Sequence, residues 1–267
     1  MIPQRKKSHL DEGLAVKVDP PPAMTDSAHI LGSFEHALRE ARNGVVRMAS
    51  IAEQNLQHAV RGLLSRNADL CNEAIAEEEE VNQLERRIDA ESFEILMRYN
   101  PVAGDLREII TGMKVANNIE RISDEARSIA RRARKLLKHP EFSEMHLIEP
   151  VYEKAAALLK DSIRAYVERN TDLAVSLYAK DLELDEVHRE VIRELGKRMD
   201  KESGQVKQLL HLIFIVRSLE RVGDHAVNIG EDAVFLINAE DIRHLGAKKA
   251  AKKLAEERAA ESGEGLV

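Results

Sequence analysis

The sequence has no tryptophan, a single cysteine and few aromatic residues of any kind, which make up 3% of its 267 residues. Strands favour aromatic and β-branched residues, whereas the abundant Leu, Ala, Glu and Arg favour helices. One cysteine, Cys71, cannot form an internal disulfide, and it cannot supply a thiolate metal site by itself. The composition therefore predicts an all-α protein that works in a reducing compartment.

Long apolar runs and an excess of positive charge are also missing. No stretch approaches the ~18 consecutive apolar residues of a membrane helix. The basic residues near the N-terminus are not followed by the apolar segment of a secretory signal. The formal net charge of −7 argues against sequence-independent binding of nucleic acid. We expect a soluble cytoplasmic protein with no membrane insertion and no nucleic-acid partner.

Only seven prolines are present, and they divide the chain because proline breaks helix interiors. Between them, apolar residues recur at spacings of three and four, which is typical of helices. Asp69 and Asp105 are expected to cap two of these helices. The pattern predicts helices over about 27–66, 69–99, 105–138, 151–169, 172–201 and 205–238.

The second half of the chain repeats the first. Ile119-Glu-Arg-Ile-Ser-Asp124 recurs as Leu219-Glu-Arg-Val-Gly-Asp224 at an offset of 100, and apolar positions around it recur as well. The fold class expected from this repeat is all-α, with two tandem antiparallel three-helix bundles. The predicted divisions are a disordered leader (1–26), a first bundle (27–139), a linker (140–150), a second bundle (151–244) and a flexible tail (245–267).

The repeated carboxylates lie where apolar residues are expected. Residues four apart share a helix face, so Glu220 and Asp224 point the same way. A helical wheel places both in line with an apolar stripe, and Asp181 and Asp185 share such a stripe with His188. An acid on a core-directed face needs a cation, hydrogen-bond donors or a proton.

Three interpretations of these acids compete. In the first, arginines such as Arg121 and Arg221 neutralise them across the bundle. In the second, carboxylates from neighbouring helices converge as metal ligands, an oxygen-rich set suited to hard cations or iron. The third, a di-metal oxidase centre, requires a Glu-x-x-His motif that does not occur beside the repeated acids. The residues by themselves leave the first two open.

At these residues the chain resembles the PhoU family of phosphate-transport accessory regulators. The resemblance covers about 27–244 and implies metal clusters, with iron or zinc as the metals and Mg, Mn or Ca as alternatives. It rests on Asn100-Pro-Val-Ala-Gly-Asp-Leu-Arg107, Asn117-Asn-Ile-Glu-Arg-Ile-Ser-Asp124, Leu219-Glu-Arg-Val-Gly-Asp-His-Ala226 and Asn228-Ile-Gly-Glu-Asp-Ala-Val-Phe-Leu236. Carried over by position, the metal ligands are Glu78, Asn82, Glu120, Asp124, Asp181, Asp185, Glu220 and Asp224.

The first set of ligands departs from the family pattern. Asn82 stands where a second acid would complete it, and Asn118 replaces a frequent acid just before the first motif. An amide oxygen can coordinate a metal but brings no charge. The first site is therefore predicted to be the weaker of the two.

The resemblance implies regulation and no enzymatic turnover. The expected function is negative regulation of phosphate uptake and starvation signalling, as a metal-binding adaptor between the phosphate ABC transporter ATPase and a sensor histidine kinase. A homodimer is expected. No P-loop, Gly-rich dinucleotide turn or Gly-x-Ser-x-Gly elbow is present, so no catalytic residue is assigned. His225, next to Asp224, is interpreted as a solvated helix histidine, with a ligand or a hydrogen-bond donor as the alternative. The alternatives are a structural scaffold without metal and a metal-dependent phosphohydrolase.

Overall fold

The computed structural model describes residues 25–201, 203–243 and 245, and these form helices and short connections without any strand. The elements are α1 (Thr25–Leu64), α2 (Ala68–Tyr99), α3 (Ala103–Leu136), the 3₁₀ helix η1 (Ser143–Leu147), α4 (Ile148–Glu168), α5 (Thr171–Lys201), the 3₁₀ helix η2 (Ser203–Gln205) and α6 (Val206–Asn238).

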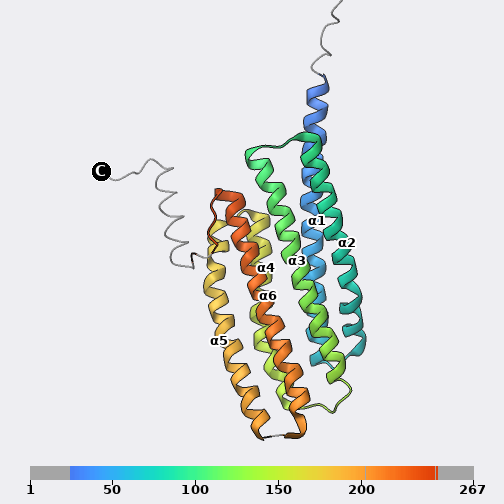
Figure 1. Ribbon diagram of the computed structural model, residues 1–267, viewed down its shortest axis with the longest axis vertical. Coiled ribbons are helices and arrows are strands. Elements are labelled where there is room, and N and C mark those ends of the chain that lie inside the picture. Colours follow the sequence, from blue (N-terminus) through green and yellow to red (C-terminus); the bar gives the residue numbers. More distant parts are fainter. Residues whose placement is uncertain (1–24, 202, 244, 246–267) are drawn as a thin grey trace, which may run out of the picture.

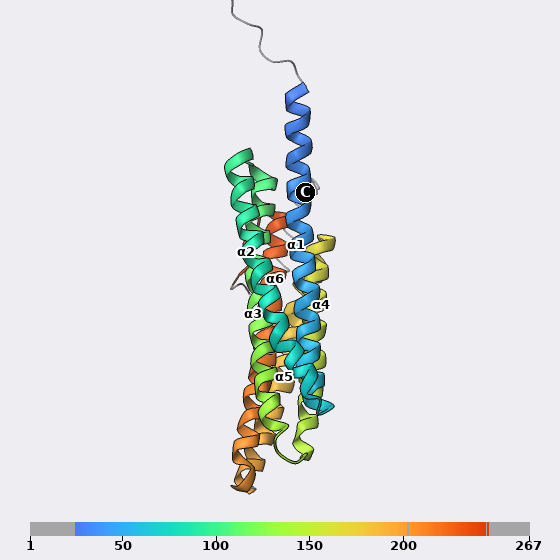
Figure 2. The ribbon, with the colours of Figure 1, turned by 90° about the vertical axis from the view of Figure 1, so that its right-hand side faces the viewer.

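The helices form the two predicted three-helix bundles. α1, α2 and α3 make one bundle and α4, α5 and α6 the other, and the two lie side by side with α2 and α5 at opposite edges (Figure 1). Turning the molecule shows α1 reaching beyond the other helices at its N-terminal end (Figure 2). None of the described helices is long and apolar enough to cross a membrane.

The two bundles share one core. α3 packs against α6 about as extensively as it packs against α1, so the buried side chains of both halves form a single cluster. The tandem repeat is therefore visible in the order of the helices, but the hydrophobic core is not divided at the linker.

Two helix starts differ from the predicted ones. Asn67, and not Asp69, caps α2, because the Asn67 Oδ1 atom accepts hydrogen bonds from the backbone N–H groups of Asp69 (2.9 Å) and Leu70 (3.3 Å). α3 begins at Ala103 without a side-chain cap, and Asp105 lies in its first turn. An acid in that turn still opposes the positive end of the helix dipole.

The predicted linker is largely helical. η1 lies inside it, and α4 begins at Ile148, so that Pro150 occupies the first turn of that helix. Proline is tolerated there because the missing N–H would have no partner in the helix. Of the predicted leader, residues 25 and 26 begin α1, and the rest lies outside the described residues, as does most of the predicted tail.

The buried face of α6 is rotated from the predicted stripe. Leu219, Val222 and Ala226 are fully buried, whereas Glu220 is only partly covered and Asp224 is exposed. The reason is that α6 contacts α3, α4 and α5, so most of its circumference is apolar and the acids occupy the rim of that surface.

Polar contacts also join the bundles. Glu108 of α3 accepts hydrogen bonds from Arg42 of α1 (2.9 Å from Nε) and from Arg169 at the end of α4 (2.6 Å). His225 of α6 lies with its Nδ1 3.1 Å from the Oδ1 atom of Asn118 on α3. The interpretation of His225 as a solvated histidine is therefore wrong, because the ring is half-buried between the bundles.

Close helix packing makes Gly223 a test of the second bundle. A Cβ atom there would lie 2.3 Å from the Cδ2 atom of the buried Leu184. We expect Gly223→Ala to lower the free energy of unfolding by about 1–3 kcal/mol through overpacking, measured by urea denaturation.

Gly196 provides the matched control, because a Cβ atom there meets nothing within 4 Å. Gly196→Ala should raise stability by about 0.5–1 kcal/mol, since alanine is the better helix former. Equal effects of the two substitutions would contradict the close packing of α5 against α6.

Candidate metal centre

The predicted ligands of the second bundle lie on facing helices. Asp181 and Asp185 are on α5, and Glu220 and Asp224 are on α6. The absence of a side chain at Gly223 lets the helices approach, and a Cβ atom at that position would lie 3.5 Å from the Asp181 Oδ1 atom. The Asp181 carboxylate therefore lies against α6, beside the two acids of the repeated motif.

Among the residues that the structure describes, no countercharge contacts these four carboxylates. Within the described residues, none of their side chains makes a hydrogen bond or an ion pair of 4 Å or less. Arg221, the arginine of the same motif, instead pairs with Glu125 of α3 at 2.8 Å. We refer to Asp181, Asp185, Glu220 and Asp224 as the α5–α6 carboxylate cluster.

The electrostatics of the cluster follow from this lack of partners. Burial, together with Asp185, Asp224 and Glu220, raises the pKa of Asp181 to about 6. Partial withdrawal from water and the charges of Glu220 and Asp185 raise the pKa of Asp224 to about 6 as well. Burial and Asp185 also raise the pKa of Glu220. The acids therefore repel one another, and a proton or a cation at this place would relieve the repulsion.

His188 adds a nitrogen to the same region. It follows Asp185 on α5, and its Nε2 atom is buried without a hydrogen-bond partner among the described residues. Burial lowers the pKa of His188, although the nearby Asp185 acts in the opposite direction. A neutral imidazole with an unpaired nitrogen is a form that can coordinate a metal.

The first bundle assembles its predicted ligands differently. Arg127 of α3 lies between two of them, with its guanidinium 2.9 Å from Glu78 Oε1 and 2.6 Å from Asp124 Oδ1. Asn82 donates a hydrogen bond to Glu78 Oε1 (2.8 Å), so that its amide stabilises the Glu78 carboxylate. The first bundle thus matches the interpretation in which arginines neutralise the acids.

Arg121 contacts the remaining acid of the first set. Its Nε lies 3.3 Å from Glu120 Oε2, and its Nη1 lies 3.6 Å from Asp124 Oδ2. Burial and the charge of Asp124 nevertheless raise the pKa of Glu120. In the first cluster, Arg127 therefore neutralises the charges of Glu78 and Asp124, whereas the ionised form of Glu120 is disfavoured.

The motif spacing in the sequence does not predict that Arg127 neutralises the first cluster, although the repeat contains a signal for it. At the offset of 100, the residue that corresponds to Arg127 is Val227. The same comparison that revealed the repeated acids thus shows that only the first copy carries an arginine at this position. Together with the exchange of Asn82 for Asp185, this difference separates a paired cluster from an unpaired one.

The donor sets fit a metal unequally. In the described part of the chain, no three His, Cys, Asp or Glu side chains already converge on one point as in a formed metal site. The α5–α6 carboxylate cluster has unpaired oxygens and the unpaired nitrogen of His188, and these donor atoms have the chemistry of a divalent-cation site. The first cluster does not fit, because Arg127 occupies the place of a cation.

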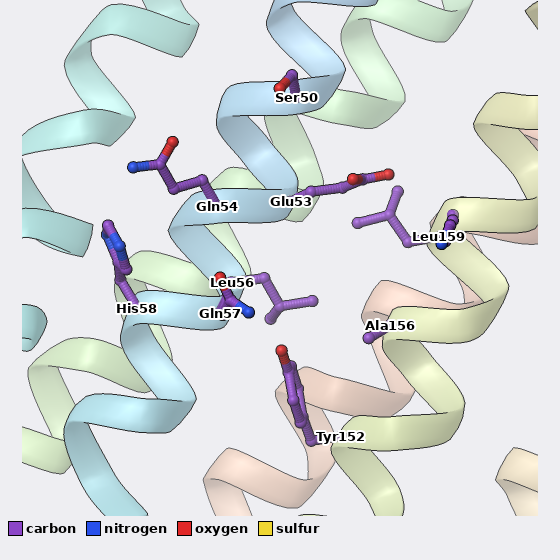
Figure 3. Close-up of a pocket in the computed structure, with 10 residues that line it drawn as sticks. Ser50, Glu53, Gln54, Leu56, Gln57, His58, Tyr152, Ala156 and Leu159 are labelled. Atoms are coloured by element: carbon purple, nitrogen blue, oxygen red, sulfur yellow. The ribbon is translucent and has the colours of Figure 1, made fainter. Parts of the chain in front are cut away.

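A groove between α1 and α4 lies outside both clusters. It has a volume of about 420 Å³, and Figure 3 shows Glu53 reaching from α1 towards α4 and Tyr152 reaching back from α4. Burial raises the pKa of Glu53, opposed by Lys160. None of the predicted ligands lines this groove, so it offers no support for a metal centre on that side.

The repeated helices and paired acidic motifs define a class of tandem three-helix proteins, and comparison with known proteins identifies the family. The PhoU domain model matches residues 45–133 and again 148–233. The chain belongs to the PhoU family. Each match falls within one bundle, which agrees with the repeat seen in the sequence.

Relatives match along most of their length. A protein of Pseudomonas putida named phosphate-specific transport system accessory protein PhoU homolog is 34% identical over 83% of this chain and 87% of its own. The phosphate-specific transport system accessory protein PhoU of Escherichia coli K12 is 30% identical over 85% of this chain and 94% of its own.

Solved structures show the same fold. The crystal structure of PhoU from Pseudomonas aeruginosa has a TM-score of 0.75 and 31% identity, covering 78% of this chain and all of the other. A phosphate transport system regulatory protein PhoU from Streptococcus pneumoniae, at 22% identity, agrees in fold with a TM-score of 0.71.

The raised pKa values predict how stability depends on pH in protein freed of metal by a chelator. The folded state holds the Asp181 and Asp224 protons up to about pH 6, whereas ordinary aspartates lose theirs near 3.8. The stabilisation is thus complete below about pH 4 and is lost as the pH rises to about 6. Asp181→Asn/Asp224→Asn should flatten this decline and raise the unfolding temperature at pH 7.5.

Asp89→Asn/Asp200→Asn removes the same number of charges outside the cluster and serves as control. It should keep the decline, because the pair with raised pKa values is intact. An unchanged decline in the Asp181→Asn/Asp224→Asn variant would show that mutual repulsion in the cluster does not govern stability.

Proposed function

We propose that this protein is a negative regulator of phosphate uptake and phosphate-starvation signalling. In this proposal it acts in the cytoplasm, as a metal-binding adaptor between the ATPase of a phosphate ABC transporter and a sensor histidine kinase, and it forms a homodimer. Membership of the PhoU family supports the proposal, and relatives named as phosphate-transport accessory proteins support the link to transport.

The α5–α6 carboxylate cluster is the observation on which the metal-binding part rests. Four acids without a countercharge are costly to hold together unless something positive binds them. In the proposal, Asp181, Asp185, Glu220 and Asp224 hold the metal, and His188 supplies a nitrogen. Iron and zinc are the proposed metals, with Mg, Mn and Ca as alternatives.

A bound cation would give this acidic surface a positive centre that attracts an anionic group of a partner. The residues of the chain then have separate tasks. The carboxylates bind the cation, the absence of a side chain at Gly223 lets α5 lie close to α6, and the Glu125–Arg221 pair directs the arginine of the same motif to an acid of α3.

The two alternatives make different demands on the same residues. A structural scaffold needs only paired acids, and the first cluster, with Glu78 and Asp124 held by Arg127, is of that kind. A metal-dependent phosphohydrolase would need turnover that depends on Asp224. Because the relatives are named for an accessory role, we propose no catalytic activity.

Metal analysis of protein purified without chelator tests the proposal. Wild-type protein should carry metal, and Asp181→Asn/Glu220→Gln should carry only a background amount, because half of the carboxylates are lost. At a free metal concentration of one hundred times the Kd, binding should stabilise the wild type by about 2.7 kcal/mol. That gain should be absent in the variant.

Glu78→Gln/Asp124→Asn removes two acids from the first cluster and serves as the matched control. It should keep the metal content of the wild type, since Arg127 already neutralises these acids. Metal-free wild-type protein, or equal metal in both variants, would favour the scaffold. Phosphatase activity lost in Asp224→Asn would favour the hydrolase.

Co-purification with the transporter ATPase and with the cytoplasmic part of the kinase tests the adaptor role. Both should be retained by the wild type, and deletion of the gene should raise phosphate uptake and starvation-gene expression. Failure to retain either partner, with the helical circular-dichroism spectrum intact, would remove the adaptor from the proposal.

A further inference from the structure

A groove lined by charged residues runs along α3 beside α6, outside the α5–α6 carboxylate cluster. It has a volume of about 480 Å³, and every residue that lines it is polar or charged. Six cations and two carboxylates line it, an excess of four positive charges in a protein whose formal net charge is −7. We call it the basic groove; its lining residues are Arg121, Asp124, Glu125, Arg127, Ser128, Arg131, Arg132, Lys135 and Arg221.

Three of these cations have no anionic partner in contact within the part of the chain that the structure describes. Among the described residues, Arg131 and Lys135 make no side-chain hydrogen bond or ion pair, and Arg132 contacts only the ring of Phe214, with its guanidinium carbon 4.1 Å from the ring centre. The other three, Arg121, Arg127 and Arg221, are each held by a carboxylate. The groove thus combines three arginines that are paired with carboxylates and three cations that are not.

The arrangement of these cations destabilises α3. Arg127, Arg131 and Lys135 follow one another at intervals of four residues, so their charges share one face of α3. Like charges at that spacing destabilise a helix. Burial also lowers the pKa of Arg132, which indicates that its charge is poorly solvated. A bound anion would remove both costs.

We propose that the basic groove is a binding site for a small anion that carries phosphate groups. The planar fork of an arginine matches two oxygens of a phosphate, and several arginines together favour a multiply charged anion over a single carboxylate.

Two classes of macromolecule fit the groove less well. A protein segment would need an apolar anchor, and no apolar side chain lines the groove. Nucleic acid needs a basic surface that extends along its backbone, whereas this chain is acidic outside the groove. The groove is distinct from the proposed metal centre, because none of the four carboxylates of the α5–α6 cluster lines it, although Arg221 lies beside both.

Isothermal titration of the full chain at low salt tests the site with orthophosphate, pyrophosphate and ATP, and with adenosine as a probe without phosphate. At least one phosphate probe should bind, and adenosine should not. Arg131→Gln/Lys135→Gln should weaken that binding tenfold or more, since charge-assisted hydrogen bonds are lost. Orthophosphate binding would identify free phosphate as the ligand, whereas binding of pyrophosphate and ATP alone would identify a chained phosphate.

Arg39→Gln/Arg193→Gln is the matched control, because both arginines are exposed and lie outside the groove. It removes the same charge and should bind the probe within twofold of the wild type. Both variants are checked for helical content by circular dichroism. The proposal is overturned if no phosphate probe binds, if Arg131→Gln/Lys135→Gln binds as the wild type does, or if the control loses binding equally.

Discussion

The close packing of α6 against three other helices is the constraint on which the rest of the structure depends. Most of the circumference of α6 is apolar, and its buried residues belong to a core that also contains those of α3 and α4. Gly223 and Gly230 let α5 approach, since a Cβ atom at either position would lie within 2.4 Å of a leucine side chain. This packing holds the two bundles together and brings the acids of α5 beside those of α6.

The two copies of the repeat use the same acids in opposite electrostatic states. In the first copy, Arg127 contacts Glu78 and Asp124, and the charges cancel at close range. In the second, Val227 stands in place of that arginine, and burial together with the neighbouring acids raises the pKa values of Asp181 and Asp224. The two copies share their helices and their acidic motif, and the exchanges of Arg127 for Val227 and of Asn82 for Asp185 separate their electrostatic states. The unpaired copy can take a cation, and the paired copy already contains one.

The fold was predictable because long amphipathic helices leave a strong signal in one sequence, and the repeat fixed their grouping into bundles. Helix ends were less predictable, because Asn67 and Asp69 are both good caps and only the backbone conformation at Asn67 decides between them. The motif spacing predicted which acids lie together. It did not predict which acids form ion pairs with arginine, because Arg127 and Arg221 each contact an acid that is distant in the sequence. The α3–α6 contact joins the two repeats. It could not be predicted from the sequence, because the apolar periodicity of a helix does not show which other helix it packs against.

The ion pair between Glu125 and Arg221 has a consequence for how the two repeats evolve. Arg221 is near enough to Glu220 and Asp224 to lower their pKa values, yet its guanidinium contacts an acid of the other bundle. The acidity of the second motif is therefore set in part by a residue of the first repeat. A change at Glu125 would free an arginine beside the carboxylates of the other repeat, so sequence changes in the two halves of this tandem protein are coupled through this pair.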